Sequence, residues 1–439
     1  MKIWVLWTGY VWLIQAVWLS SLWFDVTAVD IFPDKIDALN KGIPTIYENG
    51  LEELLKKTYE DINFTTDNTQ LQWCDVIFLC VGTPQDQSGK TDLTYITKAA
   101  IDLQKILNGD EIVVIKSTVP VWTNQMIYDI LGGENPVVSN PEFLREWLAI
   151  SDFYHPDRIV LWFKNSNQEN KDIVDRLDHI YKKFSQDGVA IIKTDWNTAE
   201  LIKYAANSFL ATKISFINEI ARLSDTVWAD IRDVAKAIGM DPRIGEQFLN
   251  AGIGYGWSCF PKDVKSLIHQ FQDKWLQSSI IEKVDHINTT QVDYFLEKIY
   301  NIYWEDLHWK VFSIVGLAFK PDTDDLRESR ALILIEKLLE KGAMLQVFDY
   351  NTKARNNFEK YAYSLNIGIK NFVPMTLTSS FDQCVQWSDA LIVALEEKRI
   401  LDENLEDIKL KDNIIFDWKN TIPREIAEKF GFTYHGMGC

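Results

Sequence analysis

The residue with the clearest capacity for covalent chemistry is Cys259, because a cysteine sulfur can attack an electrophilic carbon such as an aldehyde carbonyl. It lies in the string Gly254-Tyr-Gly256-Trp-Ser-Cys259-Phe-Pro-Lys262-Asp263, so a lysine and a carboxylate follow it closely. A lone cysteine is more often a small buried apolar residue, and an adjacent Lys–Asp pair is more often exposed. Cys259 is therefore a candidate nucleophile that needs support from the rest of the chain.

A second polar pair, Lys203 and Asn207, lies in a segment of helical periodicity. Apolar residues recur there at helical spacing, at Leu201, Ala205 and Phe209. Because Lys203 and Asn207 are four residues apart, they are expected to project from one face of this helix. Taken alone, such a lysine is more often solvated than catalytic.

The first turn, Trp7-Thr-Gly9-Tyr-Val-Trp12, partly matches a dinucleotide-binding fingerprint. That fingerprint requires glycine at positions 7, 9 and 12 and an acidic residue about 20 residues further on. Gly9 is present, and Asp30 follows a β-rich run at a strand end, where its carboxylate can bind ribose hydroxyls. With tryptophan at positions 7 and 12, the motif alone is weak.

The elements that must position these residues alternate between strands and helices. Ile3 to Leu6 and Asp25 to Asp30 flank a helical stretch, which is the opening of a parallel βαβ unit. Further strand-like runs, separated in several places by helical segments, predict a doubly wound α/β domain through about residue 193. These runs are residues 76–81, 112–116, 136–139 and 158–161, and a second α/β region has 311–315, 345–349, 390–394 and 414–417. The helical stretch between these regions extends to about residue 300, and a substrate cleft is expected between the two α/β domains.

Composition limits the possible partners and compartments. The chain has 439 residues and a formal net charge of -18, which makes nucleic acid an unfavourable partner. Its 5 cysteines are widely spread and show no metal-ligand or disulfide spacing, which is typical of a reducing compartment. Residues 3–24 contain no charged side chain, so a signal peptide or membrane anchor is an alternative for this segment, although the dinucleotide motif argues against it.

Six blocks along the chain carry a family resemblance. They are Cys80-Val-Gly82-Thr83-Pro84, Lys116-Ser-Thr118-Val-Pro120, Asn140-Pro-Glu-Phe-Leu-Arg-Glu146, Glu200-Leu-Ile-Lys203-Tyr-Ala-Ala-Asn207, the Cys259 string, and Gly316-Leu-Ala-Phe-Lys320-Pro. In type and order these blocks resemble the UDP-glucose/GDP-mannose dehydrogenase family over almost the whole chain. The string Asp324-Asp-Leu-Arg327-Glu-Ser is more similar to the UDP-glucose branch than to the GDP-mannose branch.

The resemblance implies an NAD-dependent oxidation of UDP-glucose to UDP-glucuronate, in which two hydrides leave in succession. Cys259 holds the intermediate aldehyde as a thiohemiacetal, which is then oxidised to a thioester and hydrolysed by water. The resemblance assigns stabilisation of the oxyanion to Lys203 and Asn207. It assigns the binding or activation of the hydrolytic water to Thr118, Glu146 and Asp263.

The resemblance also implies two sets of binding residues and no metal. The residues expected to bind NAD are Gly9, Tyr10, Val11, Asp30, Lys35, Gly82, Thr83, Thr118, Glu146, Lys262 and Arg327. Those expected to bind the substrate are Glu142, Phe143, Leu144, Lys203, Asn207, Arg243, Phe248, Leu249, Asn250, Gly256 and Lys320. Arg243 is expected to reach the substrate across the interface of a homodimer.

Three domains follow from these expectations. Residues 1–193 are expected to form an NAD-binding Rossmann-like domain, 194–300 a central helical dimerisation domain, and 301–439 a UDP-sugar-binding Rossmann-like domain. The expected protein is a cytoplasmic homodimer that binds a UDP-sugar, binds neither nucleic acid nor membranes, and supplies precursors of polysaccharides. Alternatives are a UDP-N-acetylmannosamine or GDP-mannose dehydrogenase, an inactive nucleotide-sugar-binding protein, and a protein anchored to a membrane through residues 3–24.

Tryptophan occupies many positions where the family motifs have glycine. The chain has 17 Trp and only 20 Gly, well below the glycine content of about 7% that is usual for proteins. The family has glycine at Trp7, Trp12, Trp122, Trp147, Trp257 and Trp418, and we expect the same at Trp18, Trp23, Trp162, Trp228 and Trp309. We hypothesise that the natural protein has glycine there, encoded by UGA codons that some bacterial lineages read as glycine. Deliberate substitution and real degeneration are the rival hypotheses, although degeneration would also erode residues such as Cys259.

Overall fold

The chain folds into two compact units in the computed structural model. The structure describes residues 1–6, 9–71, 73–86, 88–163, 171–256, 259–364 and 374–439. One unit consists of Met1–Ala206 and His269–Trp275, and the other of Asn207–Ile268 and Leu276–Cys439. The division falls inside two continuous helices, α8 (Trp196–Val227) and α10 (Phe260–Asp273). The three domains predicted from the sequence, with boundaries at residues 193 and 300, stay a prediction.

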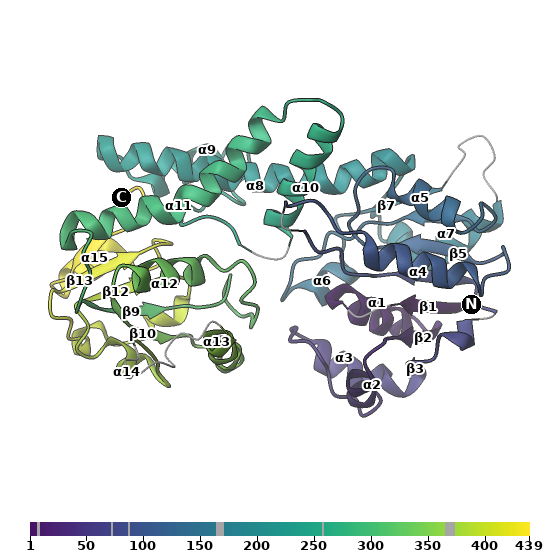
Figure 1. Cartoon of the computed structure of the whole chain (residues 1–439), viewed down its shortest axis with the longest axis horizontal. Coiled ribbons are helices and arrows are strands. Elements are labelled where there is room, and N and C mark those ends of the chain that lie inside the picture. Colours follow the sequence, from purple (N-terminus) through teal and green to yellow (C-terminus); the bar gives the residue numbers. More distant parts are fainter. Residues whose placement is uncertain (7–8, 72, 87, 164–170, 257–258, 365–373) are drawn as a thin grey trace. The chain divides into compact units, whose positions relative to one another are not determined.

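The first unit contains an eight-stranded sheet in the order β3-β2-β1-β4-β5-β6-β7-β8, seen in Figure 1 around the labels β1 to β7. All neighbouring strands are parallel except β6 and β7, which are antiparallel. The strands are β1 (Lys2–Leu6), β2 (Asp25–Val29), β3 (Ile62–Thr65), β4 (Val76–Leu79), β5 (Ile112–Ile115), β6 (Val137–Ser139), β7 (Arg158–Phe163) and β8 (Ala190–Lys193).

Helices cover both faces of this sheet, which confirms the predicted doubly wound fold. Alternate residues of β1 enter different cores: Ile3 and Val5 pack with α1 and α7, whereas Trp4 and Leu6 pack with α4 and α5. The helices are α1 (Tyr10–Ser21), α2 (Pro33–Leu39), α3 (Leu51–Thr58), α4 (Thr94–Gln104), α5 (Thr123–Ile130), α6 (Ala149–Tyr154) and α7 (Lys171–Gln186), with short 3-10 turns at η1 (Tyr59–Asp61) and η2 (Asn68–Leu71).

The second unit combines long helices with a six-stranded parallel sheet in the order β11-β10-β9-β12-β13-β14. Its strands are β9 (Val311–Val315), β10 (Met344–Phe348), β11 (Met375–Leu377), β12 (Ala390–Val393), β13 (Ile414–Asp417) and β14 (Thr433–His435). The remaining helical elements are α9 (Ile231–Gly239), α11 (Ser279–Tyr303), α12 (Arg330–Glu340), α13 (Thr352–Ser364), α14 (Phe381–Val385), η3 (Lys398–Leu401), η4 (Leu405–Asp407) and α15 (Arg424–Lys429). The predicted sequence of α/β, helical and α/β regions is confirmed.

The apolar segment at residues 3–24 contains a strand and a helix. Residues Ile3 to Leu6 belong to β1, which is hydrogen-bonded to β2 and β4, and α1 (Tyr10–Ser21) follows. Within the parts of the chain that the structure describes, we find no helix with the length and apolar character needed to cross a membrane.

Nine tryptophans have a backbone conformation that favours glycine. Among the described residues, nine of the fourteen non-glycine residues with positive φ are Trp, with φ from 57° to 82°. They are Trp23, Trp73, Trp122, Trp147, Trp228, Trp275, Trp304, Trp309 and Trp387. This left-handed region costs an L-residue about 1–2 kcal/mol, and helices commonly end on a glycine there. Trp228 follows the end of α8 in this way, and its side chain is 95% exposed, so packing does not offset the strain.

Other tryptophans lie in the core. Trp12 is 1% exposed, and its indole Nε1 donates a hydrogen bond to the carbonyl oxygen of Val5 at 2.8 Å, so this indole lies between helix and sheet. Trp18 and Trp418 are also buried, but their indole Nε1 atoms have no hydrogen-bond partner among the described residues. An unsatisfied buried donor costs about 1–3 kcal/mol. The strained and unsatisfied positions support the hypothesis that the natural protein has glycine at these sites; Trp7 and Trp257 lie outside the described residues.

Replacing Trp228, Trp275 and Trp304 together by glycine should raise the free energy of unfolding more than replacing the same three by alanine. Both triple variants remove the same exposed indoles, but only glycine relieves the left-handed strain, by about 1 kcal/mol per site. Unfolding of both variants in denaturant measures the difference. Equal unfolding free energies would mean that these sites carry no such strain.

The intact mass of the protein purified from its natural source tests the codon hypothesis itself. We expect a mass lower than that of the printed sequence by the difference between Trp and Gly at each reassigned codon. A natural mass that matches every printed tryptophan would refute the hypothesis. In the tests below, the glycine-restored chain is the chain with glycine in place of Trp7, Trp12, Trp122, Trp147, Trp257 and Trp418.

Candidate active site

Cys259 lies directly before the first residue of α10, in the second unit. Its thiol is not part of a disulfide, and the residue is partly exposed. Its carbonyl oxygen accepts a hydrogen bond from the backbone N–H of Asp263 at 2.8 Å, which begins the helix. Because the N-terminus of a helix favours negative charge, this placement suits a cysteine that reacts as a thiolate.

Asp263 is the centre of a polar cluster in the first turn of α10. Its carboxylate is fully buried, accepts a hydrogen bond from Asn207 Nδ2 at 2.6 Å and pairs with Lys262 Nζ at 2.5 Å. The structure thus brings together three residues that the sequence predicted, from α8 and α10. Asp263 therefore lies in the first turn of the helix that Cys259 precedes, with its carboxylate held by two side chains.

The backbone before Cys259 is held by close contacts within the second unit. A Cβ atom on Gly256 would lie 2.2 Å from the carbonyl oxygen of Glu328, and one on Gly254 would lie 2.4 Å from Asn288 Oδ1. Tyr255, between them, donates its N–H to Asn288 Oδ1 at 2.7 Å, and its carbonyl oxygen accepts from Arg330 Nε at 2.8 Å. Glycine at 254 and 256 is therefore required for this approach.

Lys203 forms a buried ion pair in the first unit. Its Nζ lies 3.2 Å from Glu142 Oε1, and the two side chains are 4% and 10% exposed. The same Nζ lies 5.2 Å from the centroid of the Phe143 ring, and Glu142 also accepts the N–H of Leu144 at 2.6 Å. Lys203, Glu142 and Phe143 were each expected to bind the substrate, and in the structure they lie close together. Lys203 is buried and is not the solvated lysine that its spacing alone suggests.

The loops that follow β4 and β5 are joined by two side-chain hydrogen bonds. Thr83 Oγ1 donates to the carbonyl oxygen of Thr118 at 2.8 Å, and Ser117 Oγ donates to that of Val81 at 2.7 Å. Below them, the buried Lys116 donates to Asn140 Oδ1 at 2.9 Å, and burial lowers the pKa of Lys116 to about 8. The two sequence blocks that contain Thr83 and Thr118 therefore meet at the carboxyl ends of adjacent parallel strands.

Two buried glutamates near these loops were not assigned from the sequence. Glu200, on α8, accepts the backbone N–H groups of Trp122 and Asn124 at the start of α5. Glu48 accepts those of Trp147 and Ala149 at the start of α6, directly after Glu146. Burial raises the pKa of each carboxyl group to about 7 against the effect of these hydrogen bonds. Glu200 stands in a family block and could have been noticed, whereas no local signal indicates Glu48.

Asp30 has a free carboxylate oxygen that fits a nucleotide ribose. Oδ1 accepts the N–H of Phe32 at 2.9 Å, whereas Oδ2 is buried and has no hydrogen-bond partner among the described residues. Burial is the main cause that raises the pKa of this carboxyl group. A ribose hydroxyl at Oδ2 would satisfy the unpaired acceptor, as in other dinucleotide-binding folds.

The N-terminus of α1 is the second feature that fits a dinucleotide. Gly9 is the N-cap residue, no side chain among the described residues caps the helix, and its first turn contains no acidic residue, so the N–H groups can receive a pyrophosphate. Tyr10 and Val11 begin this helix, and the Tyr10 hydroxyl accepts the N–H of Trp147 at 3.1 Å. Gly82 leaves open space where a Cβ would lie, and Lys35 Nζ lies 4.7 Å from the centroid of the exposed Phe32 ring. These residues fit NAD.

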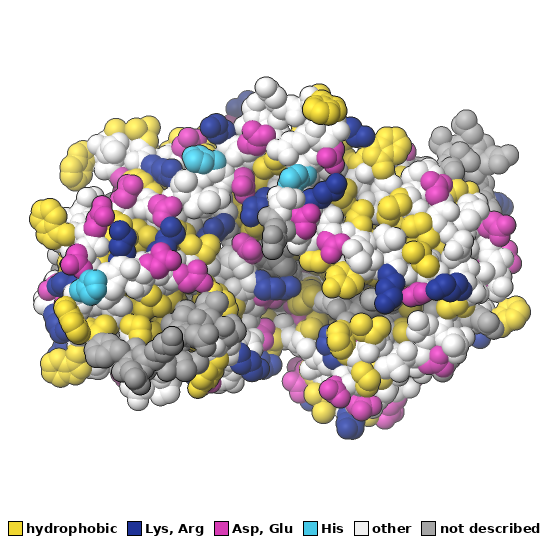
Figure 2. All heavy atoms as spheres, in the orientation of Figure 1, with side chains coloured by type: hydrophobic (Ala, Val, Ile, Leu, Met, Phe, Trp, Pro, Cys, Tyr) yellow, Lys and Arg dark blue, Asp and Glu magenta, His cyan; other side chains and the backbone are white. Residues whose placement is uncertain are grey.

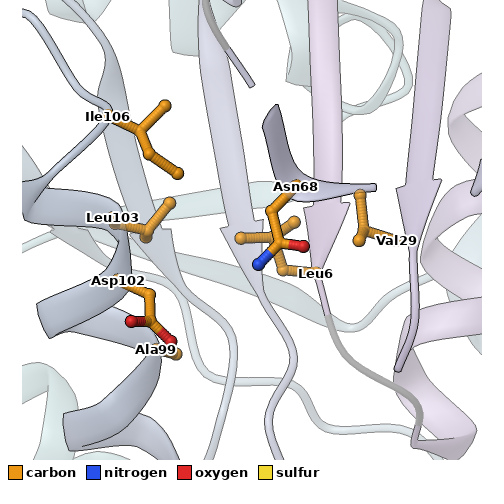
Figure 3. Close-up of a pocket in the computed structure, with 7 residues that line it drawn as sticks. All are labelled: Leu6, Val29, Asn68, Ala99, Asp102, Leu103 and Ile106. Atoms are coloured by element: carbon orange, nitrogen blue, oxygen red, sulfur yellow. The ribbon is translucent and has the colours of Figure 1, made fainter. Parts of the chain in front are cut away.

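A small cavity lies at the carboxyl ends of β1 and β2, where Leu6 and Val29 meet Asn68, the α4 residues Ala99, Asp102 and Leu103, and Ile106 just after α4 (Figure 3). Its volume is about 20 Å³, enough for about one water molecule. It borders the strand that ends next to Asp30 but is far too small for a nucleotide. Among the described residues, no group of His, Cys, Asp and Glu side chains is arranged to hold a metal ion.

Several predicted binding residues lie outside these clusters. Arg243 is exposed and pairs with its neighbour Asp241, and Arg327 pairs with Asp325 in the same way. Leu249 is 3% exposed and packs into a core with α8 and α9, so in this structure it is a core residue. Phe248 has a positive φ of 66° beside Phe260, Asn250 is exposed, and Lys320 lies over the Phe319 ring. Their predicted roles stay predictions.

The fold and these features define an NAD-dependent dehydrogenase with a cysteine as the candidate nucleophile. Three parts of the chain match the domains of one family: residues 1–185 match its NAD binding domain, 197–290 its central domain, and 313–424 its UDP binding domain. The chain belongs to the UDP-glucose/GDP-mannose dehydrogenase family.

Individual relatives cover the whole chain. It is 39% identical to a UDP-glucose 6-dehydrogenase of Rickettsia bellii (strain RML369-C) over 98% of both chains. It is 37% identical to the UDP-glucose 6-dehydrogenase YwqF of Bacillus subtilis (strain 168), over 100% of this chain and 98% of that protein. The solved structure of a UDP-glucose dehydrogenase from Pyrobaculum islandicum is 31% identical, with a TM-score of 0.88 over 100% of this chain and 97% of that one.

Replacing Asp30 by asparagine in the glycine-restored chain should lower kcat/KM for NAD by about tenfold or more, because a charge-assisted hydrogen bond to the ribose contributes about 1.5–3 kcal/mol. The ratio of activity with NADP to activity with NAD should rise, since Asn no longer repels a 2′-phosphate. The control is Asp34→Asn, at an exposed position in α2. An Asp30 variant with the same cofactor preference as this control would contradict the assignment.

Proposed function

We propose that this chain oxidises the primary alcohol of UDP-glucose to the carboxylate of UDP-glucuronate, with NAD as acceptor and Cys259 as the covalent nucleophile. The observation that carries the proposal is the position of Cys259 directly before α10, with the buried Asp263 in the next turn held by Asn207 and Lys262. A covalent bond at this stage retains the aldehyde, which would otherwise diffuse away.

Cys259 acts between the two oxidation steps. Bound NAD accepts a hydride in each of them. The sulfur attacks the aldehyde carbon and forms a C–S bond, and the oxygen takes up a proton to give a thiohemiacetal, which the second oxidation converts to a thioester. Water then attacks the same carbon, and the C–S bond breaks to release the acid and the thiolate.

The chain's own residues have distinct tasks in this sequence. The Lys203 ammonium and the Asn207 amide are donors for the oxygen that becomes negatively charged. Asp263, which already accepts hydrogen bonds from Asn207 and Lys262, removes a proton from the attacking water. Thr118 and Glu146 orient that water. Asp30 and the N-terminus of α1 hold the ribose and pyrophosphate of NAD, while Glu142 and Phe143 fix the Lys203 side chain.

Relatives favour UDP-glucose over the other sugar nucleotides. The relatives with 37% to 39% identity quoted above are named UDP-glucose 6-dehydrogenases. A UDP-N-acetylmannosamine dehydrogenase from Staphylococcus aureus is only 20% identical, and its TM-score of 0.79 supports the fold alone. A GDP-mannose dehydrogenase is 29% identical at a TM-score of 0.51. Both activities remain alternatives, and an inactive nucleotide-sugar-binding protein is the alternative if the natural protein has the tryptophans.

A homodimer is the second part of the proposal. Phe209, Phe216 and Leu223 are seven residues apart along α8 and are 66%, 48% and 57% exposed. Side chains at this spacing form one apolar stripe along a helix, which a second copy of the helix can cover. On the face shown in Figure 2, acidic and basic side chains are interspersed, which agrees with a protein–protein rather than a nucleic-acid partner.

The compartment and the pathway complete the proposal. The free thiols of Cys74, Cys80, Cys384 and Cys439 are typical of a reducing compartment, so we assign the protein to the cytoplasm. A UDP-linked uronic acid is a building block for acidic polysaccharides, and we assign that use to the product.

Replacing Cys259 by serine should abolish acid formation in the glycine-restored chain. A serine hydroxyl is a poorer nucleophile and a poorer leaving group than a thiolate, so we expect kcat to fall by about 10³-fold or more. NADH absorbance and chromatography of the sugar nucleotides measure the change, and Cys439→Ser is the matched control. Undiminished acid production by the Cys259 variant would exclude the thioester route.

Replacing Phe216 by aspartate should convert the dimer to a monomer, because two buried carboxylates would face each other across the stripe. Analytical ultracentrifugation measures the mass. Ile280→Asp is the control, because Ile280 is 69% exposed on α11 and receives the same charge. A dimer that persists in the Phe216 variant but dissociates in the Ile280 variant would place the interface elsewhere.

A further inference from the structure

The Glu200 side chain accepts three hydrogen bonds at the start of α5. Oε1 accepts from the backbone N–H of Asn124 at 2.7 Å and from Asn124 Nδ2 at 2.6 Å, and Oε2 accepts from the N–H of Trp122 at 2.8 Å. Glu200 is 2% exposed and Asn124 is 0% exposed, so water does not compete for these bonds. Backbone N–H groups supply two of the three donors, so they persist whether residue 122 is Trp or Gly.

These hydrogen bonds hold the loop that contains Thr118. Residues 116–121 connect β5 to α5, and Trp122 and Asn124 are at the N-terminus of α5, where four backbone N–H groups lack partners within the helix. A second contact acts at the same place, because Val121 N–H donates to Gln270 Oε1 at 3.0 Å. The loop is thus fixed at its carboxyl end by side chains from α8 and α10, while Thr83 fixes the carbonyl oxygen of Thr118.

Glu200 and Lys203 are three residues apart on α8, about one helical turn, and both are buried. Any movement of α8 that shifts Glu200 therefore also shifts Lys203. Lys203 is itself held by Glu142 at 3.2 Å. One rigid helix thus sets the distance between a proposed oxyanion donor and the loop with a proposed water-binding threonine.

We propose that Glu200 is a positioning residue for the dehydrogenase reaction: it fixes the Thr118 loop relative to Lys203. This inference rests on the proposed function, because the proposed function gives Thr118 and Lys203 their roles. Glu200 touches neither substrate nor cofactor in this account and acts only through the loop. Two carboxylate oxygens match three donors that converge on them, whereas a glutamine would place an NH₂ group against one of those donors.

The test compares Glu200→Gln with Glu53→Gln, an exposed site on α3 in the same unit, in the full glycine-restored chain. Asn124→Ala is a milder second variant that removes one of the three donors and leaves Glu200 in place. Hydrogen–deuterium exchange of residues 117–124 in the native state reports on the loop, and steady-state kinetics with NAD and UDP-glucose report on the reaction.

We expect faster exchange in this segment for Glu200→Gln, a kcat lowered by about tenfold or more, and KM values for both substrates within about threefold of the parent. Asn124→Ala should fall between Glu200→Gln and the parent. A general loss of stability would instead speed exchange throughout the chain, and the core strands β4 and β5 serve as the reference for this.

Either of two results would overturn the proposal: exchange in Glu200→Gln equal to that in Glu53→Gln, or faster exchange with an unchanged kcat. A parent chain that makes no NADH from UDP-glucose would contradict the proposed function and, with it, the link to catalysis. The exchange comparison would then still decide whether Glu200 holds the loop.

Discussion

Buried carboxylates that satisfy backbone N–H groups at helix starts are the interactions on which the candidate site depends. Parallel strands deliver their loops to one edge of the sheet, but the loops need partners for the N–H groups of the helices that follow. Glu200 supplies them at α5 and Glu48 at α6. Because both side chains come from distant parts of the sequence, they join the loops of Thr118 and Glu146 to the rest of the first unit. Burial disfavours the charged form of both side chains, and this raises the pKa of each carboxyl group.

Much of the fold could be predicted, because buried parallel strands leave a strong apolar signal. The runs at 311–315 and 414–417 match β9 and β13 at both ends. The strands β3, β8, β11 and β14 did not stand out because they lie at the edges of the two sheets, where side chains are less buried. In β8 (Ala190–Lys193), three of the four residues are exposed. Chemistry-bearing residues in family blocks, such as Asn207 and Asp263, were found from the sequence and do meet in the structure.

The supporting contacts could not be predicted, because they join residues that are far apart in the chain. Nothing near Glu48 indicates that it would meet Trp147, and nothing near Asn288 indicates that it would bind Tyr255. Leu249, which the resemblance assigns to substrate binding, packs against residues of α8 and α9 that are distant in the sequence. Trp12 stands where the dinucleotide-binding fingerprint has glycine, yet its indole is buried between α1 and the sheet. The nine tryptophans with positive φ differ from Trp12, because their backbone has the conformation that favours glycine.

We propose Cys259 as the covalent nucleophile because its thiol, which is in no disulfide, lies directly before α10, and the buried, hydrogen-bonded carboxylate of Asp263 lies in the first turn of that helix. The most direct measurement is mass spectrometry of the glycine-restored chain, quenched with acid during turnover of NAD and UDP-glucose. We expect a peptide containing Cys259 whose mass is increased by the UDP-glucuronosyl group, in an amount that rises to a steady level and decays when substrate is exhausted. Rapid turnover to the acid with Cys259 unmodified at every quench time and an adduct on another residue would together contradict the covalent role of Cys259.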